Sequence, residues 1–367
     1  MSLPELLVGP GTAAVLRTVL ARYRTRRPLV VATDRALRSI DAERALAGLD
    51  WWAFSDFTSN PRLDQVVEGC RARELRQPDL ILGVGGGSAM DVAKAVRLLP
   101  ADPAAALAGL LGDADRFVAE SLPLILVSTT AGSGSEVTGF ATMYDGGHKH
   151  SLDHPRVGAE TTIVDPYLMA SCPHDVTTSG LFDAVSHAVE SYWSRRATDA
   201  SRALAREALA LLSPLLGESL KDPCLELRER LIAGALAAGR AIAITRTTAA
   251  HAFAYALTIR FGIPHGVACM LNLRWLLDYN RDRSDGPSRA VIDEVVHLLG
   301  PAEGRMTGVI AGHLRRHAWP AELSGYGVGP ADLADLVAAG MGVRGRAGNN
   351  PVDLDRDSVC RALAAVL

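Results

Sequence analysis

The stretch "DLILGVGGGSAMDVAKAVRLL" (79–99) decides the fold class of this chain. Its first part, 79–87, is an apolar run of strand length that ends in three glycines. Its second part, 88–99, has apolar residues at helical spacing, and Ser88 stands where a helix N-cap is expected. A strand that runs through glycines into a helix is typical of a parallel α/β sheet that binds a ligand at its carboxyl edge.

Three more apolar runs extend this pattern through the first half of the chain. "PLVVATD" (28–34), "LPLILVSTT" (122–130) and "TTIVD" (161–165) predict further buried strands. From about Thr177 onward the sequence changes to long helical stretches, such as 198–216, 225–244 and 289–300. We therefore predict an α/β domain with a parallel sheet over residues 1–170 and an all-α domain over residues 171–367.

Composition excludes several classes of protein. The chain has 367 residues, of which 48% are hydrophobic, so it is not disordered, and no apolar run is long enough to span a bilayer. The N-terminus lacks the basic and apolar segments of a signal peptide. Five scattered cysteines without a CxxC pair favour reduced thiols in a cytoplasmic protein. A net charge of −3 gives no reason to expect nucleic acid as a partner.

The glycines that follow the second strand indicate a phosphate-binding loop. Gly86, Gly87 and Ser88 stand between a strand and a helix N-terminus, where free N–H groups and the helix dipole bind an anion. Asp91 and Lys94 on the first turns of that helix add polar groups near the same ligand. A triple glycine is equally compatible with a plain tight turn. "STTAGSGSE" (128–136) supplies a second loop of small and hydroxyl residues.

Asp34 ends the first strand of the nucleotide half. A carboxylate at this place accepts hydrogen bonds from the adenosine ribose and repels a 2′-phosphate, which predicts a preference for NADH over NADPH. The alternative is that Asp34 caps the helix that begins with "RALRSI".

One carboxylate and three imidazoles in the second half form a candidate metal site. Asp183 and His187 are four residues apart, so they share one face of a helix, and His251 and His265 follow fourteen residues apart. This donor set suits Fe²⁺ or Zn²⁺. A single histidine on an apolar helix is more often a plain core or surface residue.

Four motifs together resemble the iron-containing (group III) alcohol dehydrogenases: "GGGSAMDVAK" (85–94), "TTAGSGSEVT" (129–138), "DAVSHAVESY" (183–192) and "HAFAYALTIRFGIPHG" (251–266). The likeness continues to "NNPVDL" (349–354). It implies the dehydroquinate synthase-like fold of that family, with a dinucleotide-binding domain over 1–170 and a metal-binding, substrate-binding domain over 171–367. It also implies a metal in the cleft between them.

The resemblance also implies roles for individual residues. The metal ligands of the family match Asp183, His187, His251 and His265 in this chain. Maleylacetate reductases, which are relatives that work without a metal, lose some of these ligands, so this chain does not resemble them. The implied cofactor set comprises Asp34, Asn60, Gly86, Gly87, Ser88, Asp91, Lys94, Thr129, Thr130, Ser133, Thr142 and Lys149. Many family members carry a histidine near the nicotinamide where this chain has Tyr255, so a phenol or water must serve in the proton relay.

Local sequence around His251 and His265 resembles the phosphonoacetaldehyde reductases, which make 2-hydroxyethylphosphonate in phosphonate and phosphinate antibiotic pathways. An anionic substrate suits arginine, and Arg246 and Arg260 flank this segment. Either arginine is equally well explained as a surface charge or an ion-pair partner.

We therefore expect a metal-dependent reductase of a small aldehyde that uses NADH, or alternatively NADPH. Fe²⁺ is the expected metal and Zn²⁺ the alternative. A homodimer is usual for the family, and no nucleic-acid or membrane partner is expected. Two other hypotheses stay open: a general alcohol dehydrogenase for uncharged aldehydes, and a lyase related to the sugar-phosphate cyclases.

Overall fold

A computed structural model describes residues 4–117, 121–146, 148–300 and 304–367. The chain divides into two compact units, 1–172 and 173–367. No single helix of the described residues is long and apolar enough to cross a membrane. One sharply bent pair, Gly87–Leu98 with Pro103–Phe117, passes the same test by length and composition only.

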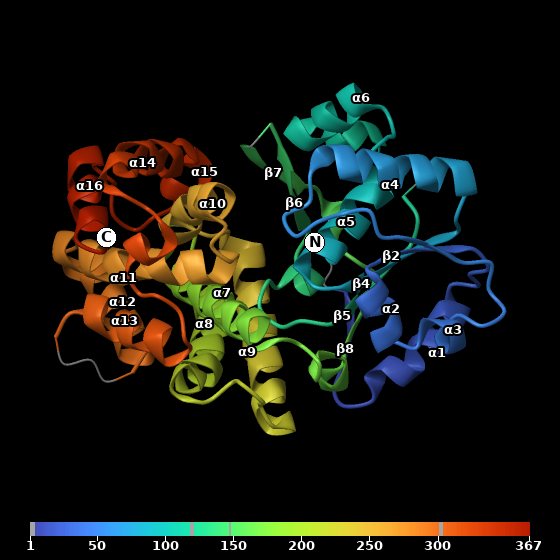
Figure 1. Ribbon diagram of the computed structural model, residues 1–367, viewed down its shortest axis with the longest axis horizontal. Helices are drawn as coiled ribbons and strands as arrows, with labels where there is room; N and C mark the ends of the chain where they lie inside the picture. The colour runs from blue at the N-terminus through green and yellow to red at the C-terminus, as the bar shows by residue number, and fades with distance from the viewer. Residues whose placement is uncertain (1–3, 118–120, 147, 301–303) are drawn as a thin grey trace. The chain divides into compact units, whose positions relative to one another are not determined.

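The first unit is built on a six-stranded sheet in which every pairing is parallel (Figure 1). In sheet order the strands are β1 (Glu5–Val8), β8 (Thr161–Val164), β5 (Leu124–Ser128), β4 (Leu80–Gly85), β2 (Pro28–Ala32) and β3 (Trp52–Phe54). The predicted fold class is confirmed, and so are the four strands predicted from sequence. The sequence did not predict β1 and β3, the two edge strands, which have four and three residues.

Helices cover both faces of this sheet. They are α1 (Leu16–Arg22), α2 (Asp34–Ser39), α3 (Ala42–Ala45), α4 (Leu63–Arg76), α5 (Gly87–Leu98) and α6 (Pro103–Ala108). Successive strand residues point to opposite faces, so Ile81 packs in the core beneath α4 and α5 while Leu80 and Leu82 pack in the core beneath α1 and α2. An antiparallel hairpin of β6 (Phe140–Asp145) and β7 (His148–Asp153) lies outside the main sheet.

The described residues of the second unit form helices joined by turns and loops, without a strand, as predicted. Its helices are α7 (His174–Trp193), α8 (Asp199–Leu212), α9 (Leu225–Thr245), α10 (Ala249–Phe261), α11 (His265–Arg283), α12 (Gly286–Leu298), α13 (Met306–Arg316), α14 (Leu333–Gly342), α15 (Arg344–Ala347) and α16 (Arg356–Ala364). Helices α7 and α11 are buried on nearly all sides, because long runs of their residues are apolar or small. Polar groups on these two helices are therefore inside the unit and need partners there.

Candidate functional site

The second unit brings the four predicted metal ligands together. Asp183 and His187 lie one turn apart on α7, His251 lies in the first turn of α10, and His265 begins α11. Oδ1 of Asp183 lies 3.7 Å, 3.3 Å and 3.9 Å from Nε2 of His187, His251 and His265, respectively. Atoms that bind one ion through bonds of about 2.0–2.2 Å lie roughly 3–3.6 Å from each other, so the distance from Asp183 to His251 lies within this range and those to His187 and His265 lie slightly beyond it.

Unsatisfied polar atoms support a cation at this place. Oδ1 of Asp183 and Nε2 of His251 are buried, and neither makes a hydrogen bond within the described part of the chain. Buried polar atoms without a partner are rare in folded proteins, and a divalent ion between these two atoms would satisfy both. The donor set, one carboxylate with imidazoles, therefore fits Fe²⁺ or Zn²⁺.

Cys269 is a fifth potential donor that the sequence reasoning missed. The ligand atoms of Asp183, His251, His265 and Cys269 all lie within 4.8 Å of one another, a group that does not include His187. Burial raises the pKa of the Cys269 thiol to about 11, so the sulfur is protonated and a weak ligand unless a metal displaces the proton. We keep His187 in the proposed ligand set because its Nε2 lies 3.7 Å from Oδ1 of Asp183. Cys269 is four residues after His265, and this helical spacing is a signal that could have identified it.

Two of the four proposed ligands, His187 and Asp183, have protonation states that suit metal binding. Burial lowers the pKa of His187 to about 4, so its imidazole is neutral near pH 7. Burial opposes a charge on Asp183, but the neighbouring imidazoles outweigh it and hold the pKa of this carboxyl well below its usual range. An ionised carboxylate therefore faces a neutral imidazole across the proposed metal position. Burial opposes a charge on His251, but its interactions with Cys269, Glu190 and Asp183 outweigh burial and raise its pKa well above the usual value, so a metal must displace a proton from this imidazole.

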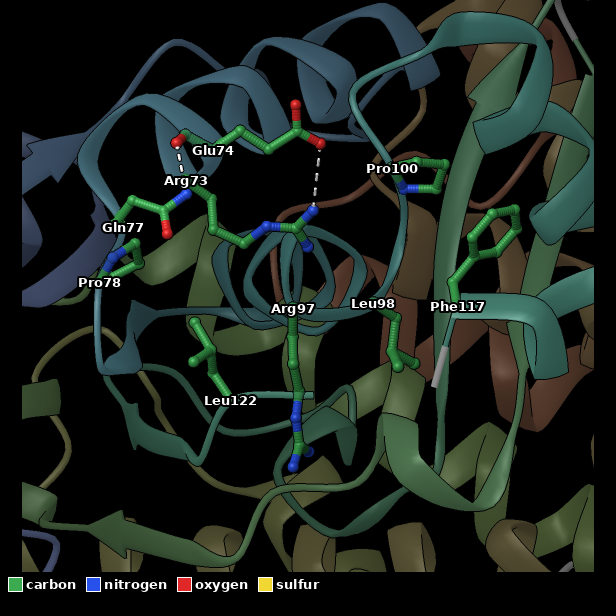
Figure 2. Close-up of a pocket in the computed structure, with 9 residues that line it drawn as sticks. All are labelled: Arg73, Glu74, Gln77, Pro78, Arg97, Leu98, Pro100, Phe117 and Leu122. Carbon is green, nitrogen blue, oxygen red and sulfur yellow. Dashed lines mark hydrogen bonds and ion pairs between the residues drawn. The ribbon is translucent and has the colours of Figure 1, made fainter. Parts of the chain in front are cut away.

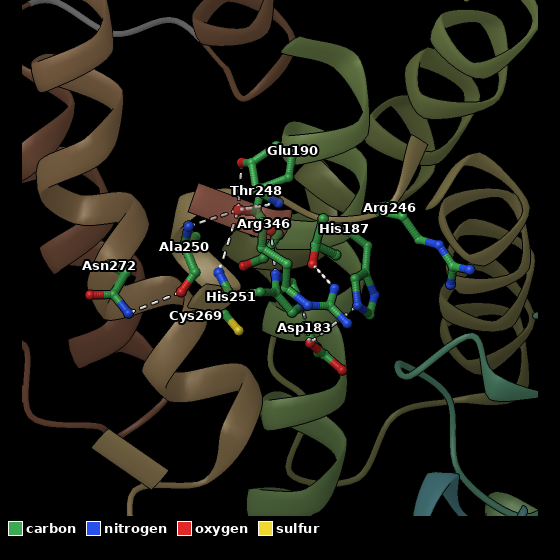
Figure 3. A network of polar contacts seen from close by, with 12 residues as sticks. Asp183, His187, Glu190, Arg246, Thr248, Ala250, His251, Cys269, Asn272 and Arg346 are labelled. Atoms are coloured by element: carbon green, nitrogen blue, oxygen red, sulfur yellow. Dashed lines mark hydrogen bonds and ion pairs between the residues drawn. The ribbon is translucent and has the colours of Figure 1, made fainter. Parts of the chain in front are cut away.

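Glu190 orients one of the ligands from behind (Figure 3). It lies on α7 with no exposed surface, and its Oε2 bonds to Nδ1 of His251. Its Oε1 accepts from the backbone N–H of Thr248 at 3.1 Å, the Thr248 hydroxyl at 2.7 Å and the Ala250 N–H at 2.7 Å. A carboxylate at Nδ1 favours the tautomer whose proton lies on that nitrogen, and in this tautomer the lone pair of Nε2, which lies 3.3 Å from Oδ1 of Asp183, is available to a metal. The sequence reasoning missed Glu190, although it follows His187 on the same helix.

Tyr255 and Arg346 lie beside the ligand cluster. The ring of Tyr255 stacks on His265 with centroids 5.8 Å apart and planes 10° from parallel. The guanidinium carbon of Arg346, on α15, lies 5.6 Å from the centroid of the Tyr255 ring. The charge of Arg346 also contributes, after burial, to the lowered pKa of His187. Nothing in the local sequence marked Arg346.

The two arginines predicted to bind substrate have different surroundings. Arg260, on α10, pairs with Asp332 at 2.9 Å and with Asp335 at 3.8 Å, so two carboxylates balance its charge. Arg246 follows the last turn of α9 in an unusual backbone conformation, with φ of 62°. Figure 3 shows its side chain extending away from the imidazole cluster. Their roles in substrate binding stay proposals.

The predicted cofactor loops meet in the first unit. A Cβ on Gly86 would lie 2.8 Å from Oγ1 of Thr130, and one on Gly87 would lie 2.9 Å from Oγ of Ser133. The loop after β4 therefore packs on the loop after β5 with no room for a side chain at either glycine. Helix α5 begins at Gly87 with Gly86 as its N-cap, so the predicted N-cap at Ser88 is wrong. The N–H groups of the first turn, including that of Ser88, have no partner within the helix.

Asp91 and Lys94 tie α5 to the second loop. Asp91 accepts from the Ser135 hydroxyl at 2.6 Å and from the backbone N–H of Thr142 at 2.8 Å. The ammonium of Lys94 is fully buried and donates to the Ser135 carbonyl at 2.6 Å and the Phe140 carbonyl at 3.0 Å. Burial lowers the pKa of Lys94 to about 8. The predicted contact of Lys94 with a cofactor is corrected, because protein oxygens enclose its ammonium and it supports the loop from beneath.

Asp34 is exposed and is the first residue of α2, two residues after the end of β2 at the carboxyl edge of the sheet. Thr33, not Asp34, is the N-cap of α2, because its side chain accepts from the backbone N–H of Ala36 at 3.4 Å. The capping alternative for Asp34 is therefore wrong. Thr129 is half-buried after β5, Asn60 is exposed with φ of 59°, and Lys149 is half-buried on β7. Their cofactor roles, like that of Asp34, stay predictions.

A surface pocket of about 330 Å³ in the first unit is a separate feature (Figure 2). Its two arginines are already engaged: Arg73 donates to the Val96 carbonyl at 2.5 Å, and Arg97 donates to the carbonyls of Arg156 and Gly158 at 2.9 Å and 2.7 Å. Arg97 lies in the last turn of α5, roughly 15 Å along the helix from the glycine loop. The pocket therefore lies apart from the cofactor loops.

Family models match both halves of the chain. The model described as iron-containing alcohol dehydrogenase matches residues 4–166, and the model of the C-terminal part of the Fe-containing alcohol dehydrogenase family matches residues 177–367. Phosphonoacetaldehyde reductase of Streptomyces viridochromogenes is 33% identical over 80% of this chain and 78% of its own length. The 1-propanol dehydrogenase PduQ of Citrobacter freundii is 31% identical over 67% of this chain and 64% of its own length.

Solved structures agree with these matches. Sulfoacetaldehyde reductase of Bifidobacterium kashiwanohense, in complex with NAD⁺, has a TM-score of 0.87 and 26% identity, over 99% of this chain and 96% of that one. An iron-containing alcohol dehydrogenase of Thermotoga maritima has a TM-score of 0.84 and 26% identity, over 99% of this chain and 98% of that one.

Proposed function

Because the chain belongs to the iron-containing alcohol dehydrogenase family, we propose that it reduces phosphonoacetaldehyde to 2-hydroxyethylphosphonate. NADH would be the hydride donor, with NADPH as the alternative. One divalent ion, Fe²⁺ or alternatively Zn²⁺, would be held by Asp183, His187, His251 and His265. Family membership makes the protein an NAD-dependent, metal-containing oxidoreductase. The substrate and its place in phosphonate natural-product biosynthesis are the proposal.

The observation that carries the proposal is the convergence of three imidazoles on one buried carboxylate oxygen. The bound ion would supply a Lewis acid for the aldehyde oxygen and stabilise the charge that grows there. The hydride chemistry belongs to the nicotinamide.

The chain's own side chains prepare this chemistry. Glu190 would hold the proton of His251 on Nδ1, which keeps the lone pair of Nε2 available to the metal. Asp183 stays ionised and cannot easily act as general base while it binds the metal. The product alkoxide needs a proton, and we propose that it comes from a water molecule ordered by the Tyr255 hydroxyl, since Tyr255 replaces the histidine usual at this position and stacks on His265.

The relatives support an acidic substrate. Two proteins similar to this chain are named for two-carbon aldehydes with an acid group, one a phosphonate and one a sulfonate. Such a substrate needs a cationic partner in the protein, for which Arg246 and Arg260 remain the candidates chosen from sequence. We also propose that the protein is cytoplasmic, which its scattered, odd-numbered cysteines support. We propose that it is a homodimer, because a homodimer is usual for the family.

The second candidate function is reduction of small uncharged aldehydes, which the similarity to a 1-propanol dehydrogenase favours. NADH oxidation by protein reconstituted with Fe²⁺ or Zn²⁺ separates the two functions. We expect a higher kcat/KM with phosphonoacetaldehyde than with propanal. Equal values would refute the phosphonate proposal and leave the general alcohol dehydrogenase. Net consumption of NADH in the same assay also tests the lyase hypothesis, because a cyclase regenerates its NAD within one turnover.

The loss of kcat/KM in Arg246→Ala and in Arg260→Ala tests whether the two arginines chosen from sequence bind the substrate. An arginine that binds the phosphonate should contribute about 2–4 kcal/mol to transition-state binding of that substrate alone. Equal losses with phosphonoacetaldehyde and propanal would mean that the residue supports the fold only.

A further inference from the structure

We propose that Arg346 is the residue that recognises the anionic group of the aldehyde substrate. This inference rests on the proposed function, since it assumes an acidic aldehyde, and it names a different side chain from the two arginines that the sequence suggested.

The position of Arg346 follows from three contacts within the second unit. Its guanidinium lies 5.6 Å from the centroid of the Tyr255 ring, Tyr255 stacks on His265 at 5.8 Å, and Nε2 of His265 lies 3.9 Å from Oδ1 of Asp183. The cation thus lies beside the tyrosine ring that stacks on one of the proposed metal ligands. A two-carbon aldehyde has its carbonyl oxygen and its acid group at opposite ends of a short molecule, which matches a metal and a cation at neighbouring places.

Within the described part of the chain, the side chain of Arg346 is paired with a hydroxyl and not with a carboxylate. Its side chain is half-buried, and its Nη1 donates to the Thr247 hydroxyl; among the residues that the structure describes, no Asp or Glu forms an ion pair with it. Arg260, by contrast, has two carboxylate partners. A half-buried guanidinium whose partner is a neutral hydroxyl has four further N–H groups for a ligand, and an anion is the partner that such a fork prefers.

The charge of the whole site favours the same conclusion. Asp183 and Glu190 are the buried carboxylates of the cluster, and together they balance one divalent ion. Arg346 then leaves the site with net positive charge. An uncharged aldehyde would leave this cation without a counter-ion, whereas a phosphonate or sulfonate would neutralise it.

Two neighbouring side chains hold the guanidinium of Arg346 in place. Thr247 fixes Nη1, and the face of the Tyr255 ring supports the planar group by a cation–π contact. A guanidinium that is already held in place loses less conformational entropy when it binds a phosphonate or sulfonate than a flexible lysine side chain would lose. Tyr255 thus has a role besides proton delivery, because its ring supports Arg346, which binds the acid group of the substrate.

The test compares Arg346→Gln and Arg346→Lys with the wild-type protein. Arg344→Gln is the matched control, because Arg344 is an exposed arginine on the same helix. Each metal-loaded enzyme is assayed with phosphonoacetaldehyde and with propanal, and ethylphosphonate is used as a competitive inhibitor against propanal. Metal content and circular dichroism are measured in parallel.

Removing one partner of a desolvated charge pair costs about 2–5 kcal/mol. We therefore expect Arg346→Gln to lower the ratio of kcat/KM for phosphonoacetaldehyde to that for propanal about 30-fold or more. Most of the loss should be in KM, and the inhibition constant of ethylphosphonate should rise in parallel. Arg346→Lys should recover part of the ratio, since it restores the charge without the fork. Arg344→Gln should change the ratio less than about twofold.

The outcomes separate this inference from the function on which it rests. A wild-type enzyme without preference for phosphonoacetaldehyde refutes the proposed function. A wild-type preference that Arg346→Gln retains refutes the role of Arg346 and leaves the proposed function standing. Equal losses on both aldehydes, or loss of metal in Arg346→Gln, show that Arg346 only supports the structure and also overturn the inference.

Discussion

Replacing Glu190 by glutamine should weaken metal binding, although Glu190 is not a ligand. The two side chains have the same shape, and the carbonyl of a glutamine can still accept from the Thr248 and Ala250 donors that Oε1 now serves. The amide NH₂ would then face Nδ1 of His251, where the carboxylate now accepts a proton. Two donors cannot face each other, so His251 must take the other tautomer and carry its hydrogen on Nε2, the atom directed at Asp183.

The magnitude follows from the loss of that lone pair. Substitution of residues that orient a metal ligand typically costs 10–100-fold in metal affinity, which corresponds to about 1.4–2.8 kcal/mol. The protein should also lose about 1.5–3 kcal/mol in free energy of unfolding, because a buried charge-assisted hydrogen bond is removed. The metal effect should exceed the effect of any exposed Glu→Gln change.

Competition with a chromophoric chelator measures this metal affinity directly, for Zn²⁺ and for Fe²⁺ under anaerobic conditions. Glu207→Gln is the control, since Glu207 is an exposed carboxylate on α8. An affinity in Glu190→Gln that equals those of the wild type and the control would refute the claim that Glu190 sets the tautomer of His251.

Three further predictions concern other parts of the molecule. Gly266→Ala should destabilise the second unit by about 3 kcal/mol or more in urea unfolding, because its Cβ would lie 1.8 Å from the Ser179 carbonyl oxygen and would separate α11 from α7; a stability equal to that of the wild type would contradict this packing. Asp34→Gly should raise kcat/KM with NADPH relative to NADH, since a carboxylate near a 2′-phosphate costs on the order of 1–3 kcal/mol; a wild-type preference for NADPH would show that Asp34 does not read the ribose. Cys269→Ser should retain one metal ion per chain by elemental analysis, because the thiol is protonated in the protein; loss of the ion would assign the sulfur as a ligand in place of His187.

The fold was predictable where the sequence carries a repeated local pattern. The four inner strands are buried at every residue and are largely apolar, because both faces of a parallel sheet are covered. Edge strands β1 and β3 have too few residues to show such a pattern, and the register of their neighbours defines them instead. Turn chemistry was predicted less well: the caps of α2 and α5 are Thr33 and Gly86, each one or two residues from the expected place.

The candidate site was predictable where spacing alone brings residues together. Asp183 and His187 share a face of α7, and Nε2 of each of the three expected histidine ligands lies 3.3–3.9 Å from Oδ1 of Asp183, while their binding of a metal stays a prediction. Lys94 shows the limit, because a lysine after a glycine loop can face a ligand or support the loop from beneath, and only the packing of β6 and its neighbours decides which. Arg346 comes from a short helix far along the chain from His265, and tertiary packing alone places it beside Tyr255.

The central claim is that Asp183, His187, His251 and His265 hold one divalent ion on which the reduction depends. Metal analysis of wild-type protein and His265→Ala, each reconstituted with Fe²⁺ or Zn²⁺ and then dialysed, tests it most directly. His265 begins α11 with part of its side chain exposed, so its removal should leave the far-ultraviolet circular dichroism unchanged. We predict one ion per wild-type chain and, in the variant, loss of both the ion and NADH oxidation. A variant that keeps a full complement of metal and full activity would contradict the account.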